Sequence, residues 1–375
     1  MTDFIPVNEP ILTGNEKKYL NQCIDTGWIS SEGPFVDMFE KNFSKQVNRE
    51  YGITVTNGTA AIDVAIEALG IKTGDEVIMP TFTIISCVLQ IVRSGATPVF
   101  IDCDPVTWNM NVTDLEELIT PRTKAIMVVH IYGLPVEMAP VLRIARKYDL
   151  KVIEDAAQMI GQTYNGEPCG SFGDISTFSF YPNKHITTGE GGMIVTDCEE
   201  LNKECRSLRN LCFKEGRRFV HESLGWNLRM SNIQAALGQA QLERLDEFVS
   251  KKREMGRIYN SLLSSLTCFE FPKDKTEYAE NIYWVYGLVL KDEVEFDADI
   301  AIKKLAELGV GARPFFWCLH EQPYFNKQGL FLEKKYPVAE RLARRGFYIP
   351  SGLSLEEPQL VRVAEALFEV FSEYC

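Results

Sequence analysis

The sequence predicts an α/β fold, with a wound, largely parallel sheet in a large N-terminal part and a smaller α+β part after it. From about residue 51, short apolar runs alternate with segments whose apolar residues recur at helical spacing. This alternation is typical of parallel strands joined by crossover helices. A chain of 375 residues, 45% of them hydrophobic, can bury the cores of two domains.

The elements follow in order along the chain. We expect a helical arm in the first 50 residues, with helices at 15–23 and 36–43 around the loop GWISSEGP. The expected strands are 53–56, 76–79, 97–101, 125–129 and 151–154, and the expected helices between them are 60–69, 84–92 and 138–148. Two further apolar runs lie on either side of residue 184.

The remainder of the chain is mainly helical at first. Helices are predicted at 199–208, 232–250 and 253–266. An α+β pattern begins near residue 275, with an apolar run at 283–289, an irregular stretch RPFFWCLHEQPYF, and helices at 298–308, 339–345 and 357–374. We place the domain boundary near residue 248, which gives a large domain of residues 1–248, including the N-terminal arm, and a small domain of residues 249–375.

Charge and composition exclude several classes of protein. Lys and Arg total 39 against 52 Asp and Glu, and the net charge of -13 would repel nucleic acid and anionic membranes. No run approaches 18 apolar residues, and the start MTDFIPVNEPIL lacks the features of a secretion signal, so we expect a cytoplasmic protein. The ten cysteines show no metal-ligand spacing, which predicts no metal site and reduced, mostly buried thiols.

Lys184 lies between two apolar runs in STFSFYPNKHITTGEGGMIV. A cation in such a place is either a solvated loop charge or an amine kept for chemistry. An amine there can form a Schiff base with an aldehyde and then move a proton, provided that burial keeps it partly neutral. The rest of the chain favours the second interpretation, because it supplies the other parts of a pyridoxal phosphate site.

The segment VTNGTAAID predicts a phosphate site, because a strand ends just before a helix that begins near Gly58 and Thr59. Free N-H groups and the positive end of the helix dipole would point outward there. Asn57 or Thr59 could instead simply cap the helix. The absence of GxGxxG and of GxxxxGK[ST] disfavours a dinucleotide or P-loop site.

The segment LKVIEDAAQMIG predicts a second part of the site. Its buried strand ends at Asp155, and ligands of open α/β sheets lie outside the carboxyl ends of strands. An Asp at this place can hold a pyridine nitrogen protonated, which makes the ring an electron sink. Gln158 could reach the phenolic oxygen of the ring, and Ser179 could donate its hydroxyl to the phosphate. The alternative is that Asp155 caps the next helix.

Several of these motifs, in this order, resemble the DegT/DnrJ/EryC1/StrS family of nucleotide-sugar aminotransferases. The resemblance runs over most of the chain, through GWISSEGPFVDMFE, TNGTAAID, MPTFT, GATPVFIDCDPVTWNM, VVHIYGLP, VIEDAAQMIG, FSFYPNKHITTGEGG, LGWNLRMSNIQAALGQAQL and RPFFWCLHEQPYF. It implies the fold-type I architecture of pyridoxal phosphate enzymes, with a mostly parallel seven-stranded sheet in the large domain and a smaller C-terminal α+β domain.

The same resemblance implies roles for individual residues. Lys184 would be the Schiff-base lysine, Asp155 the partner of the pyridinium nitrogen, and Gln158 the neighbour of the phenolic oxygen. The phosphate would be bound by Gly58, Thr59 and Ser179. Asn227 would reach the phosphate of the cofactor in the other subunit, which implies a homodimer with shared active sites.

The activity that the resemblance implies is transfer of the amino group of L-glutamate to a keto-deoxysugar nucleotide, with pyridoxal phosphate as cofactor and pyridoxamine phosphate as intermediate. Two features, ITTGEGG after the lysine and RPFF before LHEQP, are most similar to the branch that aminates C4 of GDP-4-keto-6-deoxy-D-mannose. The alternatives are another sugar-nucleotide 3- or 4-aminotransferase and a sugar 3-dehydratase, whose branch has His in place of the lysine. The dehydratase would apply if His185 held that position. A non-catalytic regulator that binds the same ligands is a further alternative.

The substrate side of the site is less well specified. Many relatives stack an aromatic residue on the cofactor ring after the PTFT motif, but here the residue is Ile84, which would pack as an aliphatic group. Arg313 and His320 are candidates for binding the sugar nucleotide or glutamate, or each has a structural role. Phe316 is either a platform for the sugar or part of the core. The loop residues Trp28 and Ser30 are weaker candidates for the substrate site.

Overall fold

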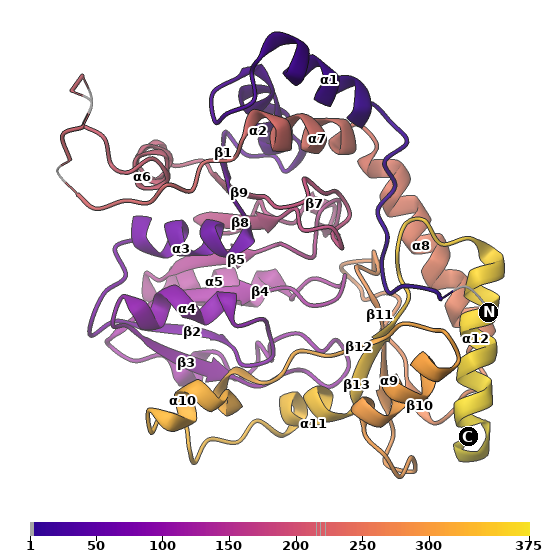
Figure 1. The fold of residues 1–375 in the computed structure, drawn as a ribbon. Coiled ribbons are helices and arrows are strands. Elements are labelled where there is room, and N and C mark those ends of the chain that lie inside the picture. Colours follow the sequence, from indigo (N-terminus) through magenta and orange to yellow (C-terminus); the bar gives the residue numbers. More distant parts are fainter. Residues whose placement is uncertain (1–3, 215, 218, 222) are drawn as a thin grey trace.

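The computed structural model describes residues 4–214, 216–217, 219–221 and 223–375, and Figure 1 shows that they build two main sheets with helices packed around them. The largest sheet has seven strands and the next has four, and a third sheet pairs only two short strands. The predicted α/β fold with a mostly parallel seven-stranded sheet and a C-terminal α+β part is therefore confirmed. None of the helices in the described ranges is long and apolar enough to cross a membrane.

The seven-stranded sheet has the order β1-β9-β8-β5-β4-β2-β3. Only β9 runs antiparallel to its neighbours, and the other paired strands are parallel. The register pairs Val129 with Asp155 and Asp155 with Thr177, so the carboxyl ends of three central strands meet at one edge. The strands are β1 (Tyr51–Val55), β2 (Glu76–Pro80), β3 (Thr97–Ile101), β4 (Thr123–Val129), β5 (Lys151–Asp155), β8 (Ile175–Ser179) and β9 (Gly192–Thr196).

Helices cover both faces of this sheet because its strands are apolar on both sides. Alternate residues of β2 enter different cores: Val77 and Met79 pack in one hydrophobic cluster, and Ile78 packs in another. The first cluster includes residues of α3 (Gly58–Ala68), α4 (Ser86–Arg93) and α6 (Glu199–Arg209). The second includes residues of α2 (Pro34–Gln46), α5 (Met138–Tyr148) and α7 (Asn232–Leu242), and α1 (Glu16–Thr26) packs on α7.

The C-terminal part is built on an antiparallel sheet of order β10-β11-β13-β12. Its core is a third hydrophobic cluster. The strands are β10 (Phe269–Glu270), β11 (Tyr286–Leu290), β12 (Arg313–Pro314) and β13 (Gly346–Ile349). The helices are α8 (Leu245–Leu262), α9 (Ala298–Glu307), α10 (Pro323–Lys327), α11 (Pro337–Arg345) and α12 (Glu357–Phe371). Short pieces complete the described chain: β6 (Thr163–Tyr164), β7 (Glu167–Pro168), and the 3-10 turns Glu116–Leu118, Leu319–Glu321 and Ser372–Tyr374.

Two details differ from the sequence expectations. The helical region after residue 232 breaks at Glu243 and Arg244, not near residue 251, and Glu243 there accepts hydrogen bonds from Asn15 and Tyr19 of the N-terminal arm. Residue 248 therefore lies inside α8, and the domain boundary placed there stays a prediction. Cys268 and Cys375 form a disulfide, so the expectation of reduced thiols was wrong for this pair. The other eight cysteines are free, and all of them except Cys198 are buried.

Candidate active site

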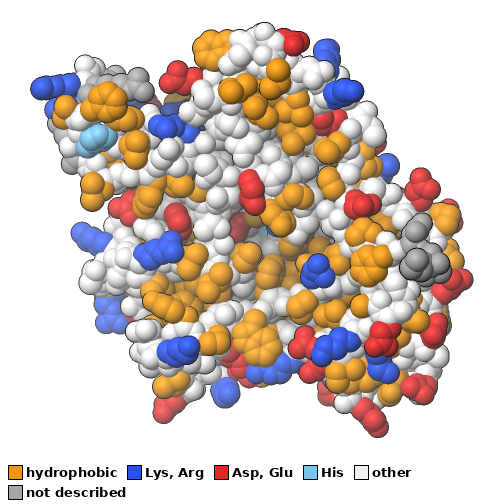
Figure 2. Space-filling view, viewed as in Figure 1, with side chains coloured by type: hydrophobic (Ala, Val, Ile, Leu, Met, Phe, Trp, Pro, Cys, Tyr) orange, Lys and Arg blue, Asp and Glu red, His pale blue; other side chains and the backbone are white. Residues whose placement is uncertain are grey.

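A pocket of about 800 Å³ opens at the edge where the carboxyl ends of β1, β5 and β8 meet. Figure 2 shows the molecule hollowed near its centre, with apolar side chains gathered around the hollow. The pocket brings together eight of the residues predicted from the sequence, namely Gly58, Thr59, Ile84, Asp155, Gln158, Ser179, Lys184 and Phe316. Parts of the chain that are far apart in sequence therefore share one cavity, as the motifs predicted.

Lys184 lies in a short turn after β8, where its N-H donates to the carbonyl of Tyr181 at 2.9 Å. Its amine lies 3.7 Å from the centroid of the Trp284 ring, an arrangement in which the aromatic face stabilises the cation. Burial among apolar groups lowers the pKa of Lys184 to about 7, although the nearby charge of Asp155 acts in the opposite direction. The amine can therefore gain and lose a proton near neutral pH.

His185 does not line the pocket. It is buried, and its Nε2 lies 3.2 Å from the carbonyl of Ile282. Burial, together with the charge of Lys252, lowers the pKa of His185 to about 3, so the ring stays neutral. The structure thus places the lysine, and not the histidine, at the pocket.

Asp155 ends β5 and is buried at the pocket wall. One carboxylate oxygen accepts the N-H of Ala157 at 3.0 Å, and the other accepts the thiol of Cys87 at 3.3 Å. Burial holds the pKa of Asp155 above its ordinary value, although these two donors and the charge of Lys184 act in the opposite direction. The residues after Asp155 form turns and no helix, so the alternative role of Asp155 as a helix cap does not apply.

α3 begins at Gly58, where the sequence predicts a phosphate site, and Asn57 caps this helix, because the Asn57 side chain accepts the N-H of Ala60 at 2.8 Å. The first N-H groups of a helix have no partner inside it, and Gly58 and Thr59, the first two residues of α3, line the pocket. Gly58 is required by the close approach of β8, because a Cβ at this position would lie 2.7 Å from the Cβ of Ser179. The hydroxyl of Thr59 hydrogen-bonds to that of Ser86 at 2.7 Å.

Gln158 is buried, and its orientation follows from its partner. Its side-chain oxygen accepts the N-H of Tyr132 at 2.6 Å. The amide nitrogen is therefore the end that remains available as a donor to a ligand. The ring of Phe316 stacks on that of Tyr132 with centroids 5.4 Å apart, so Phe316 both packs on the core and lines the pocket.

Five predicted residues lie outside this pocket, and their roles stay predictions. Arg313 lines a neighbouring hollow of about 290 Å³, which shares Tyr181, Asn183, Trp284 and Tyr348 with the pocket. The two ring nitrogens of His320 contact Thr81 Oγ1 at 2.8 Å and Glu340 Oε1 at 3.2 Å. Ser30 lines a separate hollow of about 900 Å³ together with several arginines. The remaining two are Trp28, which is half exposed, and Asn227.

The sequence did not indicate two residues that contact Lys184 or Asp155. Trp284 comes from the C-terminal part, and its Nε1-H donates to the carbonyl of Asn183 at 2.7 Å, which fixes the ring beside the amine of Lys184. Cys87 reaches Asp155 from the first turn of α4. No motif surrounds Trp284, whereas Cys87 follows the PTFT segment closely and could have been considered from its spacing.

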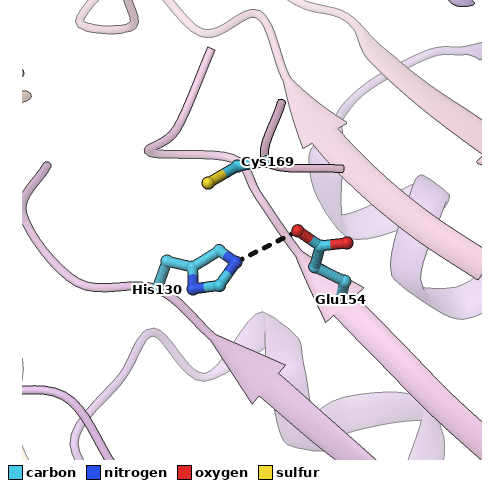
Figure 3. A group of neighbouring side chains, drawn as sticks. All are labelled: His130, Glu154 and Cys169. Atoms are coloured by element: carbon cyan, nitrogen blue, oxygen red, sulfur yellow. Dashed lines mark hydrogen bonds and ion pairs between the residues drawn. The ribbon is translucent and has the colours of Figure 1, made fainter. Parts of the chain in front are cut away.

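Three side chains outside the pocket, those of His130, Glu154 and Cys169, are close enough to suggest a metal site, and Figure 3 shows the ring of His130 facing Glu154. Hydrogen bonds already occupy the side chains of His130 and Glu154. His130 Nδ1 accepts the N-H of Val136 at 3.0 Å, so its Nε2 carries the proton and lies 3.2 Å from Glu154 Oε1. Glu154 also accepts the hydroxyl of Ser176, together with N-H groups from residues 170, 172 and 173.

These donors have a clear electrostatic effect on the buried network. Burial raises the pKa of Glu154, but the bonds from His130 and the backbone outweigh it and hold the pKa below its ordinary value. Both nitrogens of the histidine are engaged, and neither offers a free lone pair to an ion. We therefore interpret His130 and Glu154 as parts of a structural network that ties the loop at 170–173 to the end of β5.

Comparison with known proteins agrees with this geometry. The model of the DegT/DnrJ/EryC1/StrS aminotransferase family matches residues 10–368. The chain is 42% identical over 370 residues to a GDP-perosamine synthase of Escherichia coli O157:H7, covering 99% of each chain, and 41% identical to one of Caulobacter vibrioides, covering 98% of each. Among solved structures, an aminotransferase from Psychrobacter cryohalolentis superposes with a TM-score of 0.91 at 29% identity, covering 99% of each chain.

Proposed function

Because the chain belongs to the DegT/DnrJ/EryC1/StrS aminotransferase family, we propose that it moves the amino group of L-glutamate to GDP-4-keto-6-deoxy-D-mannose and so forms GDP-perosamine. Relatives named GDP-perosamine synthase, 38% to 42% identical over nearly the full chain, support this substrate. The observation that carries the chemistry is that Lys184 and Asp155 line one pocket beside the start of α3.

Pyridoxal phosphate is the cofactor, and the pocket fits it. The pocket offers the amine of Lys184 for the aldehyde, the buried carboxylate of Asp155 for the ring nitrogen, and the helix start at Gly58 for the phosphate. When bound, pyridoxal phosphate supplies an aldehyde that bonds covalently to an amine and a protonated ring that withdraws electrons from the adjacent carbon. Gly58, Thr59 and Ser179 would hold the phosphate, Asp155 the ring nitrogen and Gln158 the phenolic oxygen.

Lys184 performs the proton transfers in this proposal. Its pKa of about 7 would let the same amine move a proton between Cα of the amino donor and C4' of the cofactor near neutral pH. Asp155 would keep a proton at the ring nitrogen of the bound cofactor, because a buried carboxylate favours a cationic partner. The nucleotide of the substrate supplies binding energy far from the reacting carbon, which the protein uses to orient the sugar.

The dehydratase alternative is disfavoured by the position of His185. That reaction needs the histidine in place of the lysine, but His185 lies outside the pocket with its ring against the carbonyl of Ile282. A purely regulatory protein would not need an amine of lowered pKa in the pocket. We therefore place the amino transfer ahead of both alternatives.

The proposal includes a homodimer with shared active sites. Figure 1 shows the segment after α6 extending away from the rest of the molecule, and Leu224 in that segment is 92% exposed. Trp28 and Ile29 in the N-terminal arm are each 50% exposed. Such apolar side chains are typical of an interface, and a second copy would cover them. Asn227 follows Leu224 closely and would reach the cofactor phosphate of the other subunit.

A complementation experiment tests the shared site. Lys184→Ala and Asn227→Ala are each expected to be inactive, but a mixed dimer would hold one site with both defects and one site with neither. After unfolding and refolding of an equal mixture, we expect about a quarter of the wild-type activity to return. A mixture that exchanges subunits and stays as inactive as the separate variants would contradict the shared site.

The activity itself is tested with L-glutamate and a panel of 3-keto and 4-keto sugar nucleotides carrying GDP, UDP or dTDP. We expect GDP-4-keto-6-deoxy-D-mannose to give the highest kcat/KM and mass spectrometry to find an amino group on the product. Release of ammonia without an amino sugar would instead support the dehydratase. Borohydride reduction should place a phosphopyridoxyl adduct on Lys184. We further propose a cytoplasmic enzyme that supplies O-antigen or related polysaccharide synthesis.

A further inference from the structure

Cys87 is a buried group beside the cofactor pocket for which the proposed function has no role. It lies in the first turn of α4 and is completely shielded from solvent. Its Sγ is 3.3 Å from Asp155 Oδ2, which is within the range of a hydrogen bond to sulfur. A carboxylate can only accept, so the thiol must be the donor.

A second contact orients the thiol. Thr83 Oγ1 lies 3.5 Å from the same sulfur. The thiol has a single proton, and that proton points to Asp155, so the hydroxyl of Thr83 donates to the sulfur. Hydrogen bonds in such a chain strengthen one another. Burial, together with the negative charge of Asp155, also holds the pKa of Cys87 well above its ordinary value, so the donor keeps its proton.

We propose that Cys87 is a positioning residue that holds the Asp155 carboxylate, through its S-H group, in the orientation that faces the ring nitrogen of the cofactor. This inference rests on the proposed function. The N-H of Ala157 fixes one oxygen of Asp155, and the thiol fixes the other. With both oxygens held, the carboxylate cannot rotate, and its remaining lone pairs are left for the pocket.

The test compares Cys87→Ala, which removes the donor, with Cys87→Ser, which leaves a similar space but keeps a donor. Both variants are measured for pyridoxal phosphate affinity by titration of the cofactor-free protein and for kcat and KM. They are also measured for the ¹⁵N chemical shift of a ring-labelled cofactor, which reports protonation of the ring nitrogen. A merely structural role of Cys87 would not move that chemical shift.

For Cys87→Ala we expect about tenfold weaker cofactor binding and about tenfold lower kcat, as for loss of a hydrogen bond to a charged group. The KM for the sugar nucleotide should be unchanged, and the ¹⁵N signal should move toward the unprotonated ring. Cys87→Ser should stay within about twofold of wild type. Thr83→Val, which removes only the donor to the sulfur, should weaken cofactor binding by about twofold to threefold.

Three results would overturn the inference. The first is a Cys87→Ala variant that matches the wild type in all readouts. The second is an equal loss of cofactor affinity and kcat in Cys87→Ala and Cys87→Ser, which would mean that Cys87 acts only through packing. The third applies if Cys87→Ala does not fold: a Thr83→Val variant whose cofactor affinity and ¹⁵N chemical shift both equal those of the wild type would also overturn the inference. A wild type that binds pyridoxal phosphate on Lys184 but aminates no sugar nucleotide would instead overturn the proposed function, and the affinity and ¹⁵N comparisons would still decide the role of Cys87.

Discussion

The buried amine of Lys184 should make the stability of the cofactor-free protein depend on pH. Burial lowers the pKa of Lys184 from 10.5 to about 7. Between these values the unfolded chain binds a proton at this side chain that the folded protein lacks. The free energy of unfolding therefore rises with pH across this window, and below it both states are protonated and the contribution is constant.

The magnitude follows from the titration of one proton. From about pH 7 to about pH 9, the contribution of Lys184 to the free energy of unfolding grows by about 2 kcal/mol. Lys184→Met removes this titration. Lys252 is also buried, with a pKa lowered to about 7, but it is present in both proteins and its effect cancels in the difference. The wild type should thus gain about 2 kcal/mol more than Lys184→Met over this range.

The assay is equilibrium urea unfolding of both proteins, freed of cofactor, at the two pH values. Lys251→Met is the matched control, because Lys251 is exposed and adjacent to the buried Lys252. The control should follow the wild type at both pH values. If wild type and Lys184→Met gained the same free energy of unfolding between the two pH values, the lowered pKa and the reasoning from burial would be refuted.

Three further predictions concern neighbouring groups. Lys184→Ala should lower kcat by about 100-fold to 10,000-fold, and borohydride treatment should leave no phosphopyridoxyl adduct on any lysine. An adduct on another lysine would show that Lys184 is not the catalytic amine. Glu154→Ala should lose about 3 to 5 kcal/mol of stability in urea unfolding, because it leaves the donors of a buried network without an acceptor, and a loss below about 1 kcal/mol would contradict the network. Trp284→Leu should shift the acidic limb of the kcat profile down by about half a pH unit, because the ring stabilises the ammonium of Lys184, and an upward shift would exclude this role.

Much of the pocket could be predicted from local sequence. The strand that ends at Asp155, the glycine that begins α3 and the lysine between two apolar runs are each set by neighbours a few residues away. The carboxyl ends of parallel strands meet at one edge of a sheet. Because the sequence predicts a parallel sheet, it also predicts that residues at these strand ends lie close together. The helix cap is of the same kind, because Asn57 and Ala60 lie three residues apart.

Other features depended on contacts that no local pattern encodes. The ring of Trp284 reaches the amine of Lys184 from the C-terminal part, the helix break at Glu243 coincides with contacts from the N-terminal arm, and Cys268 meets Cys375 across 107 residues. Hydrophobic periodicity and capping patterns reflect interactions between residues within one or two turns of the chain. The three contacts above depend instead on how complete helices, strands and loops pack against one another. The sequence by itself determined the fold class and the chemical groups of the site. Only the tertiary structure decided which aromatic ring, thiol and backbone groups surround them, because packing selects those neighbours after the elements have formed.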